Sequence, residues 1–199
     1  MEATSHEPRS THSRAQWDRL TTEIETCQRC PLGATRTHAV VYRGSLRPRV
    51  VFVGEAPGAE EDRTGRPFVG RSGRRLDAAV ARLGLSESEY GVLNLLKCRP
   101  PANRFDARAA RTCRPYLDRQ LDWLRPRVLV PLGRQALRAL VPGAPSVLMA
   151  AGRPWPARPA PLFPLLHPAA ALRSRRWAER WERDVDALGA WLRAGAKTP

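Results

Sequence analysis

Short apolar runs alternate with stretches of helical character along the chain. Three runs, at 50–53, 91–96 and 128–132, are bounded by Gly, Pro or charged residues, as buried parallel strands are. A fourth run, at 161–166, is strand-like but is weakened by its prolines. The alternation predicts an α/β fold in three layers, with a central four-stranded parallel sheet flanked by helices. The predicted helices lie at 16–25, 72–83, 107–124, 133–140 and 175–192.

The chain is long enough for one medium domain. Its 199 residues bury a real core without needing a metal or a disulfide. Residues 1–14 are polar, and we expect a flexible N-terminal segment there, followed by a single domain over 15–199. The Pro-rich piece at 142–164 is predicted to be a long loop of that domain, because the strand and helix after it complete the pattern.

Charge is the feature of the composition that changes this picture. The formal net charge is +15, the sequence pI is about 11.3, and all but two of the basic residues are Arg. Clustered Arg that neutralises phosphates gains affinity by releasing counterions, so the surplus favours a polyanionic partner such as a nucleic acid. For any single Arg, a GC-rich coding preference is the simpler explanation.

No segment approaches the roughly 20 apolar residues that a membrane span requires. We therefore expect no membrane contact and a cytoplasmic protein, nucleoid-associated if its partner is DNA. The start of the chain has no apolar core like that of a signal peptide. A monomer is the expected state.

Four cysteines are poor candidates for disulfides in a reducing compartment. Cys27 and Cys30 form a C-x2-C pair, whereas Cys98 and Cys113 follow far along the chain. A zinc ribbon would show two close pairs, while a four-iron cluster can collect thiolates from one pair and two separated positions. Their spacing favours an iron-sulfur cluster, with zinc and unligated buried thiols as alternatives.

Polar and aromatic residues fall where the predicted strands end. Glu55 and Phe68 follow the first strand. Asn94 lies late in the second strand, and His167 directly follows the fourth. Because ligands bind outside the carboxyl ends of such strands, we expect these residues to converge on one crevice. Each side chain also has a simpler explanation. The carboxylate could be solvated and the phenyl ring could pack in the core. The amide could make a structural hydrogen bond, and the imidazole could fix a turn.

A series of motifs, in order, is similar to one known family. The first spans Gly54 to Gly70, the second Asn94 to Pro101 and the last Leu165 to Arg173. The segments around Cys113 and Gly133 are also familiar. Together they resemble the iron-sulfur uracil-DNA glycosylases, in the thermophile-type branch called family 4, and the resemblance runs over residues 27–192.

The resemblance implies a monofunctional hydrolase of N-glycosidic bonds that works in base-excision repair. Such an enzyme flips uracil out of single- or double-stranded DNA, cleaves its bond to the sugar and leaves an abasic site. The implied cofactor is a 4Fe-4S cluster. The implied residues are Glu55 and His167 for catalysis, Gly54, Ala56, Phe68 and Asn94 for substrate binding, and Cys27, Cys30, Cys98 and Cys113 for the cluster.

Each implied role matches the chemistry of its side chain. The Asn94 amide would donate to uracil O4 and accept from N3–H, a pattern that mismatches cytosine. The Phe68 ring would stack on the flipped base. Glu55 would orient water or stabilise positive charge on the sugar. His167 would hydrogen-bond uracil O2 as negative charge builds there.

Two segments are the implied contacts with DNA. Arg71 and Ser72 open a helix, and Leu172 and Arg173 follow the last motif. A solvated surface is an equally simple explanation for these Arg residues. Where the family commonly has two leucines, this chain has Ala171 before Leu172, so the apolar wedge is reduced. That departure predicts a preference for single-stranded or mispaired uracil.

Other readings of the chain remain open. A non-catalytic iron-sulfur module that binds DNA, or a redox protein that uses the cluster, would share the same fold. Ala56 stands where a related branch that is trapped covalently on DNA has Gln, so ordinary turnover is expected. In the last helix, Trp177 and Trp181 share one face, which predicts that both pack in the core.

Overall fold

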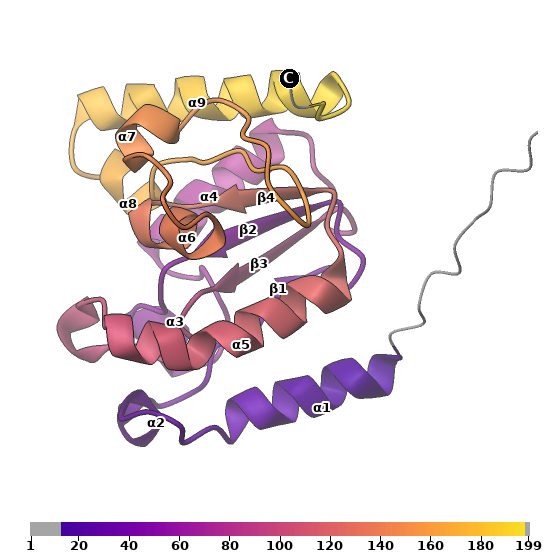
Figure 1. Ribbon diagram of the computed structural model, residues 1–199. Helices are drawn as coiled ribbons and strands as arrows, with labels where there is room; N and C mark the ends of the chain where they lie inside the picture. The colour runs from indigo at the N-terminus through magenta and orange to yellow at the C-terminus, as the bar shows by residue number, and fades with distance from the viewer. Residues whose placement is uncertain (1–12, 198–199) are drawn as a thin grey trace, which may run out of the picture.

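The computed structural model describes residues 13–197 and shows an α/β domain (Figure 1). Its central sheet has four strands in the order β1-β3-β2-β4. The α/β fold that the alternating pattern predicts is therefore confirmed. The strands are β1 (Arg43–Gly44), β2 (Val50–Gly54), β3 (Tyr90–Asn94) and β4 (Val128–Pro131).

The sheet is mixed, so the prediction of an all-parallel sheet is wrong. β2 runs parallel to both β3 and β4, whereas β1 is antiparallel to β3. The segment at 161–166 is not a regular strand, although isolated parallel bridges at Leu162 and Leu165 join it to the β4 side of the sheet. Pro161 and Pro164 interrupt it because a proline has no N–H for the ladder. The fourth strand is instead the short β1.

Helices cover both faces of the sheet. In chain order they are α1 (Arg14–Glu25), α2 (Leu32–Thr35), α3 (Ala59–Thr64), α4 (Arg71–Arg82), α5 (Ala107–Leu124), α6 (Arg134–Leu140), α7 (Val147–Ala150), α8 (Pro168–Ala171) and α9 (Arg175–Arg193), with a 3-10 turn at Pro101–Asn103. α4 and α9 lie on one side of the sheet, and α5 lies on the other with α1 outside it (Figure 1). None of the described helices combines the length and the apolar character that crossing a membrane requires.

The predicted helices are confirmed, with small shifts at their ends. α5 has the predicted bounds, α6 and α9 differ by a single residue at one end, and α4 is shifted by one residue at both ends. α1 begins at Arg14 because Ser13 and Gln16 form a capping box, each side chain bonding the other's backbone N–H. Of the predicted flexible segment, residues 1–12 lie outside the described residues. α7 interrupts the predicted loop at 142–164.

Alternate residues of β2 build the two halves of the core. Val51 and Val53 pack on the side of α5, and Val50 and Phe52 pack on the side of α4 and α9. Successive side chains of a strand point to opposite faces, so a strand covered on both faces is apolar throughout. This is why the three parallel strands were visible in the sequence as unbroken apolar runs.

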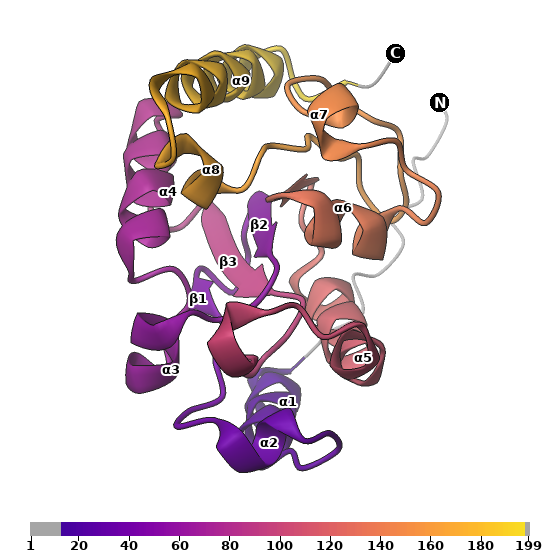
Figure 2. The same ribbon diagram turned by 90° about the vertical axis from the view of Figure 1, so that its left-hand side faces the viewer.

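The carboxyl ends of the parallel strands meet at one edge of the sheet. β2 ends at Gly54, β3 at Asn94 and β4 at Pro131, with Gly54 and Asn94 in register. Figure 2 views the molecule from this side, where α3, α6 and α8 surround the edge. The loops that follow the strands therefore face one shared space, as doubly covered sheets arrange them.

The two tryptophans predicted to pack in the core behave differently. Trp181 is 1% exposed and packs among the core residues of α4 and α9. Trp177 lies one turn closer to the start of α9, is half-buried and does not belong to that cluster. The prediction is therefore confirmed for Trp181 and wrong for Trp177, because α9 begins beyond the end of the core.

This difference predicts unequal effects on stability. Trp181→Ala should lower the free energy of unfolding by about 3–5 kcal/mol, the usual cost of emptying a buried aromatic site. Trp177→Ala should lower the free energy of unfolding by well under half of that amount, because the Trp177 ring is only half-buried. Urea unfolding of both variants measures the difference, and equal losses would place Trp177 in the core after all.

Candidate active site

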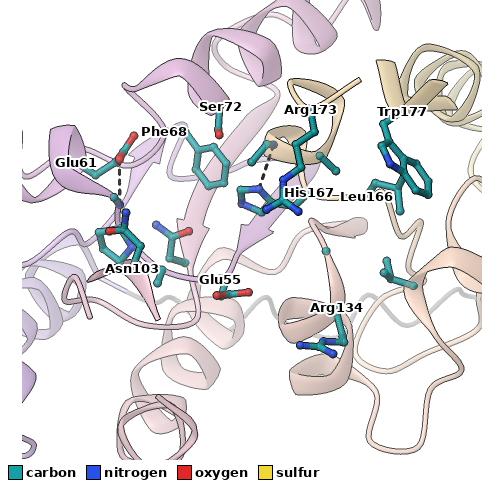
Figure 3. Close-up of a pocket in the computed structure, with 18 of the residues that line it drawn as sticks. Glu55, Glu61, Phe68, Ser72, Asn103, Arg134, Leu166, His167, Arg173 and Trp177 are labelled. Atoms are coloured by element: carbon teal, nitrogen blue, oxygen red, sulfur yellow. Dashed lines mark hydrogen bonds between the residues drawn. The ribbon is translucent and has the colours of Figure 1, made fainter. Parts of the chain in front are cut away.

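A cavity of about 650 Å³ opens at the carboxyl edge of the sheet (Figure 3). Its walls come from the loop after β2, the end of β3, the start of α6, the loop that carries α7, and the segment around α8. Three of the residues expected to bind the base or DNA do not line it: Gly54, Arg71 and Leu172. The predicted residues that line the cavity are Glu55, Ala56, Phe68, Ser72, Asn94, His167 and Arg173.

Asn94 is the most unusual of these residues. It ends β3, is 1% exposed, and neither Oδ1 nor Nδ2 of its side chain has a hydrogen-bond partner in the described structure. Gly54 sits opposite, and a Cβ atom there would lie 2.3 Å from Asn94 Oδ1. Buried amides are nearly always paired, so a free one beside a cavity needs an explanation that a ligand can supply.

Phe68 lies against the same glycine in a strained backbone conformation. Its φ is 56°, a value that bulky residues rarely adopt, and its side chain is 5% exposed. A Cβ atom on Gly54 would lie 2.6 Å from the Phe68 ring, and one on Gly73 would lie 1.8 Å from the Phe68 carbonyl oxygen. Two glycines thus make room for this ring, and such local strain is typical of functional sites.

His167 presents a defined tautomer to the cavity. It precedes α8, and its Nδ1 accepts a hydrogen bond from the Ala169 backbone N–H at 3.2 Å, so Nε2 carries the proton. Burial, and to a smaller extent the charge of Arg173, lower the pKa of His167 to about 4, while Glu61 opposes the shift. At neutral pH the ring is therefore an uncharged donor. Its centroid lies 6.0 Å from that of Phe68.

Glu55 directly follows β2 and is half-buried at the cavity. Burial raises the pKa of its carboxyl, and the guanidinium of Arg134 opposes that shift. The Glu55 backbone is held in place because its carbonyl oxygen accepts from the Leu96 N–H at 3.0 Å. Figure 3 shows Glu55 between Phe68 and Arg134. A carboxylate held near a cation, in partial contact with solvent, can polarise a water or face a developing cation.

Glu61 supports the cavity and was not predicted as a site residue. Its carboxylate accepts backbone N–H bonds from Gly58 at 3.0 Å, Val69 at 2.9 Å and Gly70 at 2.8 Å. It thereby ties the loop after β2 to the loop that carries Phe68 (Figure 3). The signal was present in the sequence, since a Glu three residues after a helix-capping position is the pattern of a capping box.

Other lining residues were missed although some of them lie in the motifs. Leu166 belongs to the last motif, and Arg134 opens α6 within the familiar segment around Gly133, so similarity offered a weak signal for both. Val147 and Leu148 come from the Pro-rich loop and Trp177 from the first turn of α9, where no motif marks a functional residue. The missed residues include Asn103, Arg134, Val147, Leu148, Leu166 and Trp177.

The segments expected to contact DNA lie around the cavity mouth. Ser72 and Arg173 line the cavity, and Arg71 is exposed beside Ser72 at the start of α4. Leu172 is 42% exposed, whereas Ala171 is 7% exposed and belongs to the core. Ala171 is therefore buried in this chain, and the preference for single-stranded or mispaired uracil stays a prediction. Leu172 is the protruding side chain.

The four cysteines line a second, small cavity between α1, α2, α5 and the segment after β3. Arg36 Nη1 donates to Cys98 Sγ at 3.1 Å, and buried Lys97 lies at the same cavity. Within residues 13–197, no three Cys, His, Asp or Glu side chains converge closely enough to hold a single metal ion. Four thiols around one space, with cations beside them, match in kind the donor set of an iron-sulfur cluster.

Comparison with known proteins agrees with this arrangement. The uracil DNA glycosylase superfamily matches residues 41–187. A type-4 uracil-DNA glycosylase of Thermotoga maritima is 40% identical over 158 residues, which are 76% of this chain and 81% of that protein. One from Sulfurisphaera tokodaii is 38% identical over 165 residues, 78% of this chain and 75% of that protein.

A third relative extends the similarity over more of the chain. The type-4 uracil-DNA glycosylase of Archaeoglobus fulgidus is 35% identical over 181 residues, which are 86% of this chain and 91% of that protein. The family match at 41–187 includes the sheet and the cavity residues from Glu55 to Trp177. The chain belongs to the uracil DNA glycosylase superfamily and, within it, to the type-4 uracil-DNA glycosylases.

Proposed function

We propose that this chain is a monofunctional uracil-DNA glycosylase of base-excision repair. It takes a flipped uracil into the 650 Å³ cavity, hydrolyses the N-glycosidic bond and leaves an abasic site in the DNA. The observation that carries the proposal is the buried, unpartnered amide of Asn94 beside the Phe68 ring. Family membership and this pair of side chains support the same substrate.

Asn94 and Phe68 recognise the base in this proposal. The Asn94 Nδ2–H donates to uracil O4, and its Oδ1 accepts from N3–H. Cytosine does not fit, because its exocyclic amine is a donor and would face the Asn94 Nδ2–H, which is also a donor. The Phe68 ring stacks on one face of the pyrimidine, and Gly54 leaves space for both side chains. Ala56 completes the loop on the same wall.

His167 and Glu55 act on the two charges that form as the bond breaks. The neutral His167 ring donates from Nε2–H to uracil O2, where negative charge builds on the leaving base. Glu55 orients the water that attacks the sugar, or stabilises its oxocarbenium-like state. The described residues that line the cavity include no lysine, so no amine nucleophile stands ready to cleave the strand.

The surroundings of the cavity provide the contacts with DNA. Arg173, Ser72 and Arg71 bind phosphates of the strand that carries uracil, and the high net charge attracts that strand. Leu172 enters the space that the flipped base leaves. We propose that the enzyme works as a monomer on nucleoid DNA and accepts uracil in both single and double strands.

We propose that Cys27, Cys30, Cys98 and Cys113 hold a 4Fe-4S cluster in the small second cavity. When bound, the cluster would crosslink the N-terminal helices to α5 and to the segment after β3, which is a structural contribution. The hydrolysis proposed above needs no electron transfer.

Replacing Asn94 should separate activity from stability. Asn94→Ala removes two hydrogen bonds to the base, each worth about 1–3 kcal/mol, so single-turnover release of uracil should fall by at least about 30-fold. The free energy of unfolding should stay equal or rise, because the amide has no partner to lose. Release is measured on a labelled single-stranded oligonucleotide.

A matched control is Gln120→Ala, at a fully buried amide that donates to the Val41 carbonyl oxygen at 3.0 Å and does not line the cavity. It should show the opposite pattern, with stability lost and excision retained. If Asn94→Ala unfolds the protein, or releases uracil at the normal rate, the amide is structural. Binding of DNA by wild-type protein without any release would favour the non-catalytic module.

The depressed pKa of His167 predicts how stability changes with pH. The folded pKa is about 4 and the ordinary value is 6.5, so the unfolded chain binds this proton first as pH falls. The contribution is complete above pH 6.5 and is lost on the way down to about 4. His167→Asn, which can still cap α8, should remove about 2–3 kcal/mol of the stability lost between pH 7.5 and 4.5. Urea titrations at both pH values measure this, and identical losses in both proteins contradict it.

Glu55→Gln should leave DNA binding intact and slow the chemical step. General-base or charge stabilisation by a positioned carboxylate contributes about 10²- to 10⁴-fold, so the single-turnover rate should fall within that range. The amide has a similar shape, so the Kd for a uracil-containing oligonucleotide should change little. A rate within a factor of two of wild type would remove Glu55 from the mechanism.

A further inference from the structure

We propose that the cavity contains a second subsite, built around Trp177, that takes the nucleobase next to the flipped uracil. This inference rests on the proposed function, because it places the neighbour of a uracil already seated at Phe68 and Asn94. The subsite is the apolar wall formed by Trp177, Leu148 and Leu166. Figure 3 shows Trp177 and Leu166 on the side of the cavity away from Phe68. Its ligand is an unstacked base of the same strand.

The composition and size of this wall carry the first part of the argument. Trp177 lines the cavity and lies outside the core cluster that holds Trp181. Leu148 is 52% exposed and lines the same cavity, and Leu166, which directly precedes His167 in the chain, also lines it although it is only 4% exposed. The cavity, at about 650 Å³, holds more than one pyrimidine ring. An aromatic ring left in partial contact with solvent at such a site has stacking surface to offer.

The wall is also held rigidly. The Trp177 backbone N–H donates to the Ser174 side chain at 3.4 Å, which fixes it in the capped first turn of α9. Arg180 pairs with Asp184 at 2.9 Å and donates to the Ala151 carbonyl oxygen at 3.1 Å. Through these contacts α9 holds the end of α7, which carries Leu148, beside its own first turn. A preorganised platform loses little entropy when a base stacks on it.

Charge at the platform selects a nucleic-acid strand as the occupant. The Arg176 guanidinium lies over the Trp177 ring, 5.7 Å from the centroid, so a base that stacks on this ring would use the opposite face. In the described part of the chain, no ion pair includes Arg173 or Arg176, although their neighbours Arg175 and Arg180 are paired with carboxylates of α9. Free guanidinium groups beside an aromatic platform suit a phosphodiester that links two bases.

A stacking site for the neighbouring base would reduce the cost of flipping. When uracil leaves the stack, the base beside it loses one stacking partner, and this accounts for part of the few kcal/mol that flipping costs. The Trp177 ring replaces that partner without reading sequence, since every base has a π-face. The effect belongs to the strand that carries uracil, so it operates on single-stranded substrates as well.

The test is a cycle that changes the protein and the DNA together. Single-stranded oligonucleotides carry uracil with a normal base, or a tetrahydrofuran spacer without a base, on the 5′ or the 3′ side. For wild-type protein, one of the two spacers should lower kcat/KM by about 5- to 150-fold. Trp177→Ala should lower kcat/KM on the normal substrate by a similar factor, and the same spacer should then cost nothing further.

Two variants control for folding and for general loss of activity. Trp177→Phe keeps a stacking ring and should recover most of the wild-type kcat/KM together with its sensitivity to the spacer. Trp191→Phe changes an α9 tryptophan that packs on Phe163 and does not line the cavity, so it should behave as wild type. Inhibition by free uracil should be equal in all of these proteins, because the uracil seat is unchanged.

The outcomes distinguish this inference from the proposed function. No uracil release by wild-type protein from the unmodified oligonucleotide would overturn the glycosylase itself. Normal release with no effect of either spacer would overturn the subsite alone. An undiminished spacer effect in Trp177→Ala would also overturn it, since the neighbouring base would then stack elsewhere.

Discussion

One buried amide without a protein partner is the constraint on which the site depends. Asn94 sits at the end of a fully buried strand, in register with Gly54, where its polar atoms reach no donor or acceptor of the described chain. Such a group costs about 1–3 kcal/mol, and the positive φ of Phe68 adds local strain. The paired strands on either side offset these costs. The hydrogen-bonding edge of a bound pyrimidine would pair with the amide. Binding would thereby remove the free-energy cost of leaving the amide unpaired in the folded protein.

The same burial sets the charges of the groups around the amide. Burial lowers the pKa of His167, which keeps its ring a neutral donor, and raises the pKa of Glu55, which Arg134 counteracts. One physical cause therefore produces an uncharged hydrogen-bond donor near Phe68 and a carboxyl with a raised pKa, a shift that a nearby cation opposes. A reaction that expels an anionic base from a cationic sugar needs these two groups on different sides of the bond.

Lys97 connects the cysteine cavity to β3, the strand that ends at Asn94. It is 1% exposed, lines the cavity with the four thiols, and donates from Nζ to the Asn94 carbonyl oxygen at 2.5 Å. Burial lowers the pKa of Lys97 to about 8, while Cys113 and Cys98 oppose the shift. The Lys97 Nζ donor thus holds the backbone of Asn94 while its side chain lines the cysteine cavity. The sulfur site and the cavity form one connected structure rather than two modules.

The sequence by itself determined the apolar strands, the long helices and the residues of the cavity that belong to motifs. Strands β2 and β4, covered on both faces, must be apolar throughout, and the 18 residues of α5 repeat their pattern often enough to be read. Only the tertiary structure decided that 161–166 is not a strand, that Glu61 ties two loops and that Trp177 lines the cavity while Trp181 packs in the core. Periodicity states which face of an element a residue occupies. What covers that face depends on where neighbouring elements end, and this is set by packing between segments distant in sequence.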